Sequence, residues 1–249
     1  MPDHDDVTED RILGGKILLK QAKRGYRAGL DAALLAAAVE AAPGERALEA
    51  GCGPGAALLQ AAARGPEATF VGLERDPQAL ALAQANLRTA GLEDRAAAIG
   101  GDVAAGFARL GLPAFDAAFA NPPYFDDRGA IRGPAPEREG AYMADDGLEA
   151  WTRFLLKAVR PGGRILVIHR AERLADLLAL LGAGAGSFRI RPLHPFADAP
   201  AKRVLVRCVK TGKAPLVLLP ALVLHERDGA KHTPAVDAIL RGEAGLAWD

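Results

Sequence analysis

Short apolar segments alternate along this chain with alanine- and leucine-rich segments of helical composition. The apolar segments begin near Arg46, Thr69, Arg95, Phe115 and Gly163. Such alternation predicts a parallel sheet whose strands are joined by helices that cover both of its faces. Two later segments, 187–191 and the alternating 202–210, have the pattern of strands that close the sheet.

The residues before this alternating region predict a small N-terminal motif. Residues 11–21 have the pattern of a hairpin that turns at Gly14-Gly15. A helix is expected from Asp31 to Ala42. We therefore expect an N-terminal extension, residues 1–44, that packs on one domain formed by residues 45–249.

The first strand of the alternating region leads into a glycine-rich turn. Arg46 to Gly51 forms the expected strand, Cys52-Gly53-Pro54-Gly55 the turn, and Ala56 to Arg64 the following helix. Glycines let a ligand approach the backbone closely, and a proline suits the first helical turn. This strand, turn and helix therefore predict a nucleotide-binding site.

The next two strands each end near a carboxylate. Glu74 ends the segment that begins at Thr69, and it can accept hydrogen bonds from both hydroxyls of a ribose. The following strand is expected to end at Gly101-Asp102-Val103, where Asp102 can accept from an adenine amino group. The glycine pattern also fits the dinucleotide fingerprint, which would make Glu74 the ribose-binding acid of an NAD enzyme.

An apolar run from Phe115 ends abruptly in Asn121-Pro122-Pro123-Tyr124. The prolines lack N–H groups and have a fixed φ, so the loop is stiff and its carbonyls remain acceptors. The Asn121 side-chain oxygen and the Pro122 carbonyl can accept both hydrogens of one planar amino group, while Tyr124 offers a face for stacking a base. A plain turn is the alternative, but the nucleotide site upstream favours chemistry on an amino group.

Composition and charge fit a soluble cytoplasmic enzyme with one large α/β domain. The chain has 249 residues, 50% of them hydrophobic, and 31 basic residues balance 31 acidic ones. Its two cysteines, Cys52 and Cys208, imply no disulfide framework. The N-terminus is acidic and the longest apolar stretch, 214–224, contains two prolines, so neither a signal peptide nor a transmembrane helix is expected.

Two clusters of basic residues predict contacts with phosphates, although solvated faces are the alternative. The clusters are Lys16, Lys20, Lys23, Arg24 and Arg27, and Lys202, Arg203, Arg207, Lys210 and Lys213. The long polar loop 125–146 is expected to order when a substrate binds.

For a few isolated residues, a functional role and a structural role are both possible interpretations of the sequence. The segment from His225 to His232 suggests a metal site, but a hairpin turn at Asp228-Gly229 is favoured and no metal is expected. Trp151 is expected to pack on the core from a helix, with base stacking as the alternative. Tyr26 and Tyr142 are further candidates for stacking.

The ordered set of Glu49, Glu74, Asp102 and Asn121-Pro-Pro-Tyr resembles the amino-methylating branch of the class I S-adenosylmethionine-dependent methyltransferases. Together with residues 21–35, 160–170 and 224–229, it resembles the bacterial tRNA1(Val) adenine-N6 methyltransferase family in particular. The resemblance covers nearly the whole chain from Arg11. Ala22, where a proline is commoner in relatives, is one departure.

The resemblance implies a Rossmann-like sheet of seven strands, mostly parallel with the last one antiparallel, and S-adenosylmethionine lying over the glycine turn. It implies these cofactor-binding residues: Arg27, Asp31, Glu49, Ala50, Gly51, Cys52, Gly53, Gly55, Glu74, Arg75, Asp102, Val103 and Asn121. The implied catalytic residues are Asn121, Pro122, Pro123 and Tyr124. For Asp31, capping of the helix that follows is an equal alternative.

The implied reaction is methyl transfer to N6 of an adenosine in RNA. The anticodon loop of a tRNA is the favoured substrate, because a base leaves its stack most cheaply in a single-stranded loop. Protein-glutamine N5 methylation is the alternative, although such enzymes usually carry a helical domain before the core and only about 45 residues precede it here. An rRNA amino methyltransferase and a non-catalytic RNA-binding module are further alternatives, and no membrane or obligatory protein partner is expected.

Overall fold

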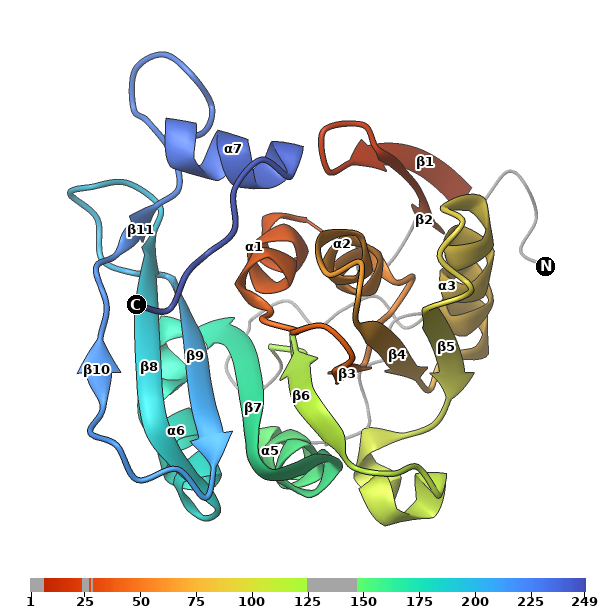
Figure 1. The fold of residues 1–249 in the computed structure, drawn as a ribbon. Helices are drawn as coiled ribbons and strands as arrows, with labels where there is room; N and C mark the ends of the chain where they lie inside the picture. The colour runs from red at the N-terminus through yellow and green to blue at the C-terminus, as the bar shows by residue number, and fades with distance from the viewer. Residues whose placement is uncertain (1–6, 24–26, 28, 125–146) are drawn as a thin grey trace, which may run out of the picture.

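A nine-stranded sheet forms the centre of the computed structural model, which describes residues 7–23, 27, 29–124 and 147–249 (Figure 1). Seven of its strands are β3 Arg46–Ala50, β4 Thr69–Glu74, β5 Ala96–Gly100, β6 Phe115–Ala120, β7 Val159–Arg170, β8 Ala185–His194 and β9 Arg203–Lys210. They lie in the order β8-β9-β7-β6-β3-β4-β5. Only β9 runs antiparallel to its neighbours in this series, β7 and β8. The predicted sheet with an antiparallel last strand is therefore confirmed.

Two very short strands extend the sheet beyond the predicted seven. They are β10 Val217–Leu218 and β11 Leu222–Val223, and both pair in parallel with β8 at the outer edge. The prolines that surround these residues keep each strand short, because proline cannot donate to a ladder.

Helices cover both faces of the sheet and create two hydrophobic cores (Figure 1). One face carries α1 Leu30–Ala38, α2 Ala56–Arg64, α3 Pro77–Thr89 and α7 Pro234–Arg241. The other face carries α5 Leu148–Ala158 and α6 Leu174–Gly182. The described residues also include the 3-10 turns η2 Val103–Ala105, η3 Phe107–Leu110 and η4 Ala171–Arg173. No helix of the described residues is long and apolar enough to cross a membrane.

Helix α1 ends four residues before the predicted end at Ala42. Val39 already has extended backbone, and the Ala42 N–H donates to the Glu45 carboxylate at 2.7 Å. Ala42 also precedes Pro43, which disfavours helical backbone at that position. The predicted end was too late because the apolar composition continues from Val39 to Ala42, where the backbone is no longer helical.

The predicted N-terminal hairpin is confirmed and docks near the glycine turn. Strands β1 Val7–Ile12 and β2 Ile17–Ala22 pair antiparallel across a turn that contains both predicted glycines. The buried Asn86 side chain of α3 donates to the Lys20 carbonyl at 2.8 Å and to the Pro54 carbonyl at 2.9 Å. One amide thus joins β2 to the glycine turn.

The C-terminal region departs from the sequence-based expectation. No strand follows Asp228-Gly229 among the described residues; residues 227–232 bend into α7 instead, so the predicted hairpin turn is wrong. The physical reason lies in the next two residues, because Thr233 caps α7 and Pro234 occupies its first turn. His225 and His232 stack at 5.0 Å, and the described residues contain no group of three potential metal ligands.

The chain ends by closing over the C-terminus of α1. The Trp248 indole N–H donates to the Ala38 carbonyl, and the Leu246 N–H donates to the Ala37 carbonyl, both at 2.8 Å. These bonds satisfy carbonyls that a helix end leaves without partners. Trp248 is 3% exposed, so the tail contributes this one side chain to the core while its other residues stay partly or fully exposed.

Candidate active site at the carboxyl edge of the sheet

The residues predicted to form the site meet at one edge of the sheet. Glu49 and Ala50 end β3, Glu74 ends β4, and Asn121 directly follows β6. The pairing places Ala50 beside Leu73 on one side and beside Ala120 on the other. The carboxyl ends of parallel strands are where open α/β sheets bind ligands.

The three glycines of the turn all have positive φ, but they serve different purposes. A Cβ on Gly51 would lie 2.4 Å from Trp151 Cη2, and one on Gly55 would lie 2.8 Å from Leu59 Cδ1. A Cβ on Gly53 would meet nothing within 4 Å. The Trp151 ring therefore leaves no room for a Cβ at Gly51, a Cβ at Gly55 would require the flexible Leu59 side chain to shift, and of the three only Gly53 faces open space.

Trp151 belongs to α5 and is 8% exposed, so the prediction that it packs on the core is confirmed. Its ring packs against Gly51 at the start of the glycine turn, a contact that the sequence did not indicate. The Trp151 indole N–H is buried without a hydrogen-bond partner. Because Trp151 is buried, its ring offers little exposed surface for stacking a base.

We expect Gly51→Ala to destabilise the protein by about 2–3 kcal/mol, which corresponds to a fall in Tm of roughly 5–10 °C, because it adds a clash to a strained backbone. Gly44→Ala is the matched control: Gly44 has φ +78 and open space around its missing Cβ, so it reports backbone strain alone. Thermal unfolding of both variants measures the difference. Equal losses of stability would show that Trp151 imposes no constraint.

Glu74 organises the backbone around the turn as well as facing it. Its carboxylate accepts from the N–H groups of Gly53, Arg75 and Asp76, each at 2.8 Å. A carboxylate has about four acceptor positions. About one acceptor position of the Glu74 carboxylate therefore remains for a ribose hydroxyl. To accept from both ribose hydroxyls, as the sequence suggested, Glu74 would have to lose one of these backbone hydrogen bonds.

Glu49 is a buried acid, 3% exposed, whose Oε2 has no hydrogen-bond partner. Burial raises the pKa of its carboxyl well above the ordinary value; the Leu58 backbone N–H opposes this shift, and the Glu74 charge adds to it. A cationic ligand group would supply the missing partner for Glu49 Oε2. Cys52 is also buried, and burial raises the pKa of its thiol, followed by the charges of Glu49 and Glu74.

Asp102 lies just beyond β5 rather than at its end. Strand β5 stops at Gly100, and Asp102 caps the short turn η2 by accepting from the Ala104 N–H at 2.9 Å. Its neighbour Val103 is buried in the core, and Arg75 is exposed directly after Glu74. Asp102 therefore holds a fixed position beside the end of β4, where Gly101 donates to the Glu74 carbonyl at 3.0 Å.

Arg27 and Asp31, both expected beside the cofactor, contact different parts of the protein. Arg27 donates to the Thr8 hydroxyl and the Asp10 carboxylate, both at 2.7 Å, so it holds the N-terminal hairpin. Asp31 does not cap α1, because the capping position is Gly29 and no side chain caps it. The capping alternative for Asp31 is therefore wrong, and its carboxylate turns towards Tyr124 instead.

Tyr124 is held from several directions beside Asn121. Its hydroxyl oxygen lies 2.7 Å from Asp31 Oδ2 and 2.8 Å from Asn121 Oδ1. The Arg203 guanidinium lies over the ring, 4.5 Å from its centroid, and donates to Asp31 at 3.1 Å. The His169 ring meets the Tyr124 ring edge-on at 5.2 Å. Pro122 is buried and Pro123 exposed, so the loop itself is anchored at Pro122.

Sequence reasoning missed the roles of Arg203 and His169 next to Tyr124. The sequence pattern places Arg203 in a basic cluster, and it gives His169 no role of its own within residues 160–170. The expected antiparallel direction of the last strand was the available signal, because it brings the start of β9 to the carboxyl edge of β7. There Arg203 pairs with Arg170, one residue from His169.

Basic residues of both predicted clusters take part in contacts within the protein. Along β9, Arg203 lies at the site, Arg207 pairs with Glu40 at 2.9 Å, and Lys210 donates to the Val159 carbonyl near the opposite edge. In the first cluster, Lys20 pairs with Glu9 and Arg27 with Asp10. Arg24, Tyr26, Tyr142 and the loop 125–146 lie outside the described residues.

Burial lowers the pKa of His169 from its ordinary 6.5 to about 4, and the charges of three neighbouring arginines act in the same direction. These arginines are Arg173, Arg170 and Arg203. His169 is 3% exposed, and its Nδ1 is buried without a hydrogen-bond partner. The ring is therefore neutral at pH 7 and lies in a positive environment.

The His169 pKa predicts an acid-dependent loss of stability. The unfolded chain takes up the proton below about pH 6.5, while the folded protein resists until about pH 4, so stability falls as pH decreases through this window. The contribution is at most about 3 kcal/mol. Urea unfolding at pH 7 and pH 4.5 should show a smaller loss for His169→Asn than for the wild type. Identical losses would contradict the shifted pKa.

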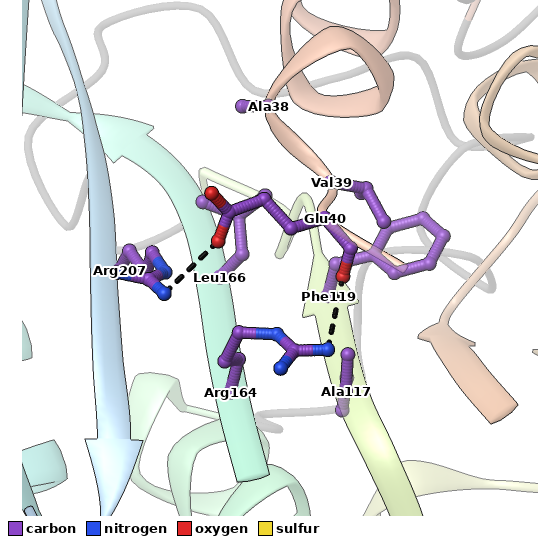
Figure 2. Close-up of a pocket in the computed structure, with 9 residues that line it drawn as sticks. Ala38, Val39, Glu40, Ala117, Phe119, Arg164, Leu166 and Arg207 are labelled. Atoms are coloured by element: carbon purple, nitrogen blue, oxygen red, sulfur yellow. Dashed lines mark hydrogen bonds and ion pairs between the residues drawn. The ribbon is translucent and has the colours of Figure 1, made fainter. Parts of the chain in front are cut away.

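A separate small cavity lies among α1, β6, β7 and β9, as Figure 2 shows. Arg207 pairs there with the Glu40 carboxylate, and Arg164 donates to the Glu40 carbonyl at 3.3 Å. The cavity has room for at most about one water molecule. It is too small for a nucleotide and is distinct from the site at the carboxyl edge.

The site fits S-adenosylmethionine on three observations of the residues themselves. The buried Glu49 Oε2 lacks a partner that the cationic methionine end would provide. Gly53 faces open space, and Glu74 beside it retains acceptor capacity for a ribose. Asp102 lies just beyond the end of β5, where it can accept from an adenine amino group.

Comparison with known proteins agrees with this arrangement. A family model described as "Methyltransferase domain" matches residues 41–187. The tRNA1(Val) (adenine(37)-N6)-methyltransferase of Porphyromonas gingivalis is 31% identical over 160 residues, which cover 61% of this chain and 61% of that protein. The release factor glutamine methyltransferase of Moorella thermoacetica is 34% identical over 155 residues, covering 59% of this chain and 53% of that protein.

A solved structure described as a predicted O-methyltransferase from Agrobacterium tumefaciens aligns with a TM-score of 0.72 and 28% identity, covering 87% of this chain and 98% of that one. The alignments with the two curated relatives span 61% and 53% of their lengths. The family model covers more than half of this chain and excludes the dehydrogenase alternative. The chain therefore belongs to the methyltransferase-domain family, as a class I S-adenosylmethionine-dependent methyltransferase.

Proposed function

We propose that this protein methylates the N6 amino group of an adenosine in RNA, with the anticodon loop of a tRNA as its substrate. The observation that carries the proposal is the arrangement of Asn121 and Tyr124. An amide and an aromatic ring are held together directly after β6, at the same sheet edge as Glu74 and the glycine turn. This pair suits a planar amino group attached to a ring.

The chain's residues would act chiefly by positioning. An aromatic amine is a weak nucleophile because its lone pair is delocalised into the ring. Asn121 and the Pro122 carbonyl accept its two hydrogens and favour the pyramidal form, in which the lone pair is available. Such positioning supplies several kcal/mol in favourable cases. S-adenosylmethionine supplies an electrophilic sulfonium methyl group when bound.

Methyl transfer needs no strong base, because the amino nitrogen loses its proton only after the new bond has formed. The amino nitrogen forms a bond to the methyl carbon, and the carbon–sulfur bond breaks with its electron pair remaining on sulfur. The methylated nitrogen then loses one proton to water. The Cys52 thiol takes no part as a base, because its raised pKa keeps it protonated.

Charge and stacking favour RNA over a protein substrate. Arg170, Arg173 and Arg203 surround His169, and His169 touches Tyr124. A nucleotide offers both a base for Tyr124 and phosphates for these cations, whereas a glutamine side chain offers neither. A single-stranded loop lets the base leave its stack at low cost. A tRNA substrate and free cysteines are compatible with the cytoplasm, where we propose that the enzyme acts.

Protein-glutamine N5 methylation is the second candidate. A glutamine side chain presents the same planar amino group to Asn121 and Pro122. The 34% identity to a release factor glutamine methyltransferase favours it directly. The two substrates differ in what they offer to Tyr124 and to the surrounding arginines.

The test is methyl transfer from labelled S-adenosylmethionine to undermodified bulk tRNA, with a glutamine-bearing release factor as the parallel substrate. We expect label in tRNA, N6-methyladenosine in its nucleoside digest, and a steep fall in activity with salt. Arg170→Gln should weaken tRNA binding and reduce the salt dependence. Label in the release factor alone, or in neither substrate, would overturn the proposal.

A further inference from the structure

The Tyr124 hydroxyl lies between two oxygen atoms but has only one hydrogen. Its oxygen is 2.7 Å from Asp31 Oδ2 and 2.8 Å from Asn121 Oδ1. A tyrosine hydroxyl donates one hydrogen bond and accepts others through its lone pairs. It cannot donate to Asp31 and to Asn121 at the same time.

Asp31 is the stronger hydrogen-bond acceptor for that hydrogen. A carboxylate accepts shorter and stronger hydrogen bonds than an amide oxygen does. Asp31 also receives the Arg203 Nε–H at 3.1 Å, and this ion pair favours the charged carboxylate. Arg203 covers one face of the Tyr124 ring, so the hydroxyl is held against Asp31.

The contact with Asn121 must then run in the opposite direction. The oxygen and nitrogen of an amide have nearly the same shape, so the hydrogen-bond partners decide which is which. With its hydrogen given to Asp31, the Tyr124 oxygen can only accept. Asn121 therefore presents its NH2 to Tyr124 and turns its oxygen to the opposite side of the amide.

We propose that Asp31, acting through the Tyr124 hydroxyl, fixes the orientation of the Asn121 amide so that its oxygen faces the target amino group. The opposite orientation would set one NH2 against another and could not hold the substrate. Asp31 and Arg203 are positioning residues in this scheme. Tyr124 contributes a hydroxyl as well as a face for stacking. The consequence for catalysis rests on the proposed function, but the orientation itself does not.

The sequence makes the orientation directly measurable, because the chain has only two asparagines, Asn86 and Asn121. Selective ¹⁵N labelling of asparagine side chains therefore gives two NH2 signals by NMR. Asn86 is an internal control, since its NH2 is buried and donates to the Lys20 and Pro54 carbonyls. Neither bond involves Tyr124.

We expect Tyr124→Phe to shift the Asn121 NH2 signal and to speed its exchange with water by roughly tenfold, since the acceptor is lost. Asp31→Asn should act in the same direction, because it lets the hydroxyl hydrogen turn towards Asn121. The Asn86 signal should not change. An Asn121 NH2 signal that is indifferent to both variants would overturn the inference, whatever the substrate of the enzyme.

The kinetic counterpart is a double-mutant cycle on methyl transfer. Tyr124→Phe and Asp31→Asn should each lower kcat by about tenfold or more, with the affinity for S-adenosylmethionine unchanged. The kcat of the double variant should be no lower than that of the less active single variant. Asp237→Asn, in the exposed pair with Arg241 on α7, is the matched control and should keep full activity. Losses that multiply would contradict a shared path. An inactive wild type would instead count against the proposed function.

Discussion

Replacement of Asn121 by alanine is expected to lower the rate of methyl transfer by about 10³-fold, while the affinity for S-adenosylmethionine stays within about twofold. The variant loses the side-chain acceptor for the target amino group and the contact with the Tyr124 hydroxyl at 2.8 Å. The glycine turn and Glu74, which face the cofactor, are untouched. Single-turnover transfer to tRNA and calorimetric binding of the cofactor measure the two effects separately.

Arg153→Ala is the control for this comparison. Arg153 lies on the exposed side of α5, and its ion-pair partner Glu149 is 68% exposed, so its loss should change neither rate nor binding. Asn121→Asp should retain part of the activity, because it keeps an acceptor but adds a negative charge near Asp31. Full activity in Asn121→Ala would remove Asn121 from the catalytic assignment.

Glu74→Ala is expected to weaken cofactor binding by about 100-fold or more and to lower Tm by several degrees, because each hydrogen bond to a charged group contributes about 1.5–3 kcal/mol. Two effects combine in this variant. The ribose loses its acceptor, and the N–H groups of Gly53, Arg75 and Asp76 lose theirs. Calorimetry with S-adenosylmethionine and thermal unfolding measure both.

Asp76→Ala separates the two effects within the same loop. The Asp76 carboxylate caps α3 by accepting from the Gln78 N–H at 2.9 Å, so its loss should cost about 1 kcal/mol of stability. It should leave the affinity for the cofactor almost unchanged. If Asp76→Ala weakened binding as much as Glu74→Ala, order in the loop rather than the Glu74 acceptor would govern affinity.

Local sequence signals succeeded where the chemistry of one residue type limits the backbone. The helix Ala56 to Arg64 was predicted with the bounds of α2, and the strand before the glycine turn to within one residue of β3, because glycine and proline restrict what a short segment can form. The loop Asn121-Pro-Pro-Tyr follows β6 for the same reason. These signals were enough to indicate a nucleotide site and chemistry on an amino group.

Local signals failed where a neighbour competed for the same residue. Asp31 is a good helix-capping residue by type, but Tyr124 and Arg203 take its carboxylate. Asp228-Gly229 is a good hairpin turn, but no strand follows because Thr233 starts a helix. The basic residues of β9 form a cluster in the sequence, yet the strand carries them from one edge of the sheet to the other.

The sequence by itself determined the order of the elements, the glycine turn, the acids that follow the strands and the stiff loop after β6, because each depends on residues that are neighbours in the chain. Only the tertiary structure placed Trp151 beneath Gly51, and Asp31, Arg203 and His169 around Tyr124. These contacts join residues far apart in the chain. They depend on helix packing and on the antiparallel direction of β9, and so they arise only when the sheet is complete.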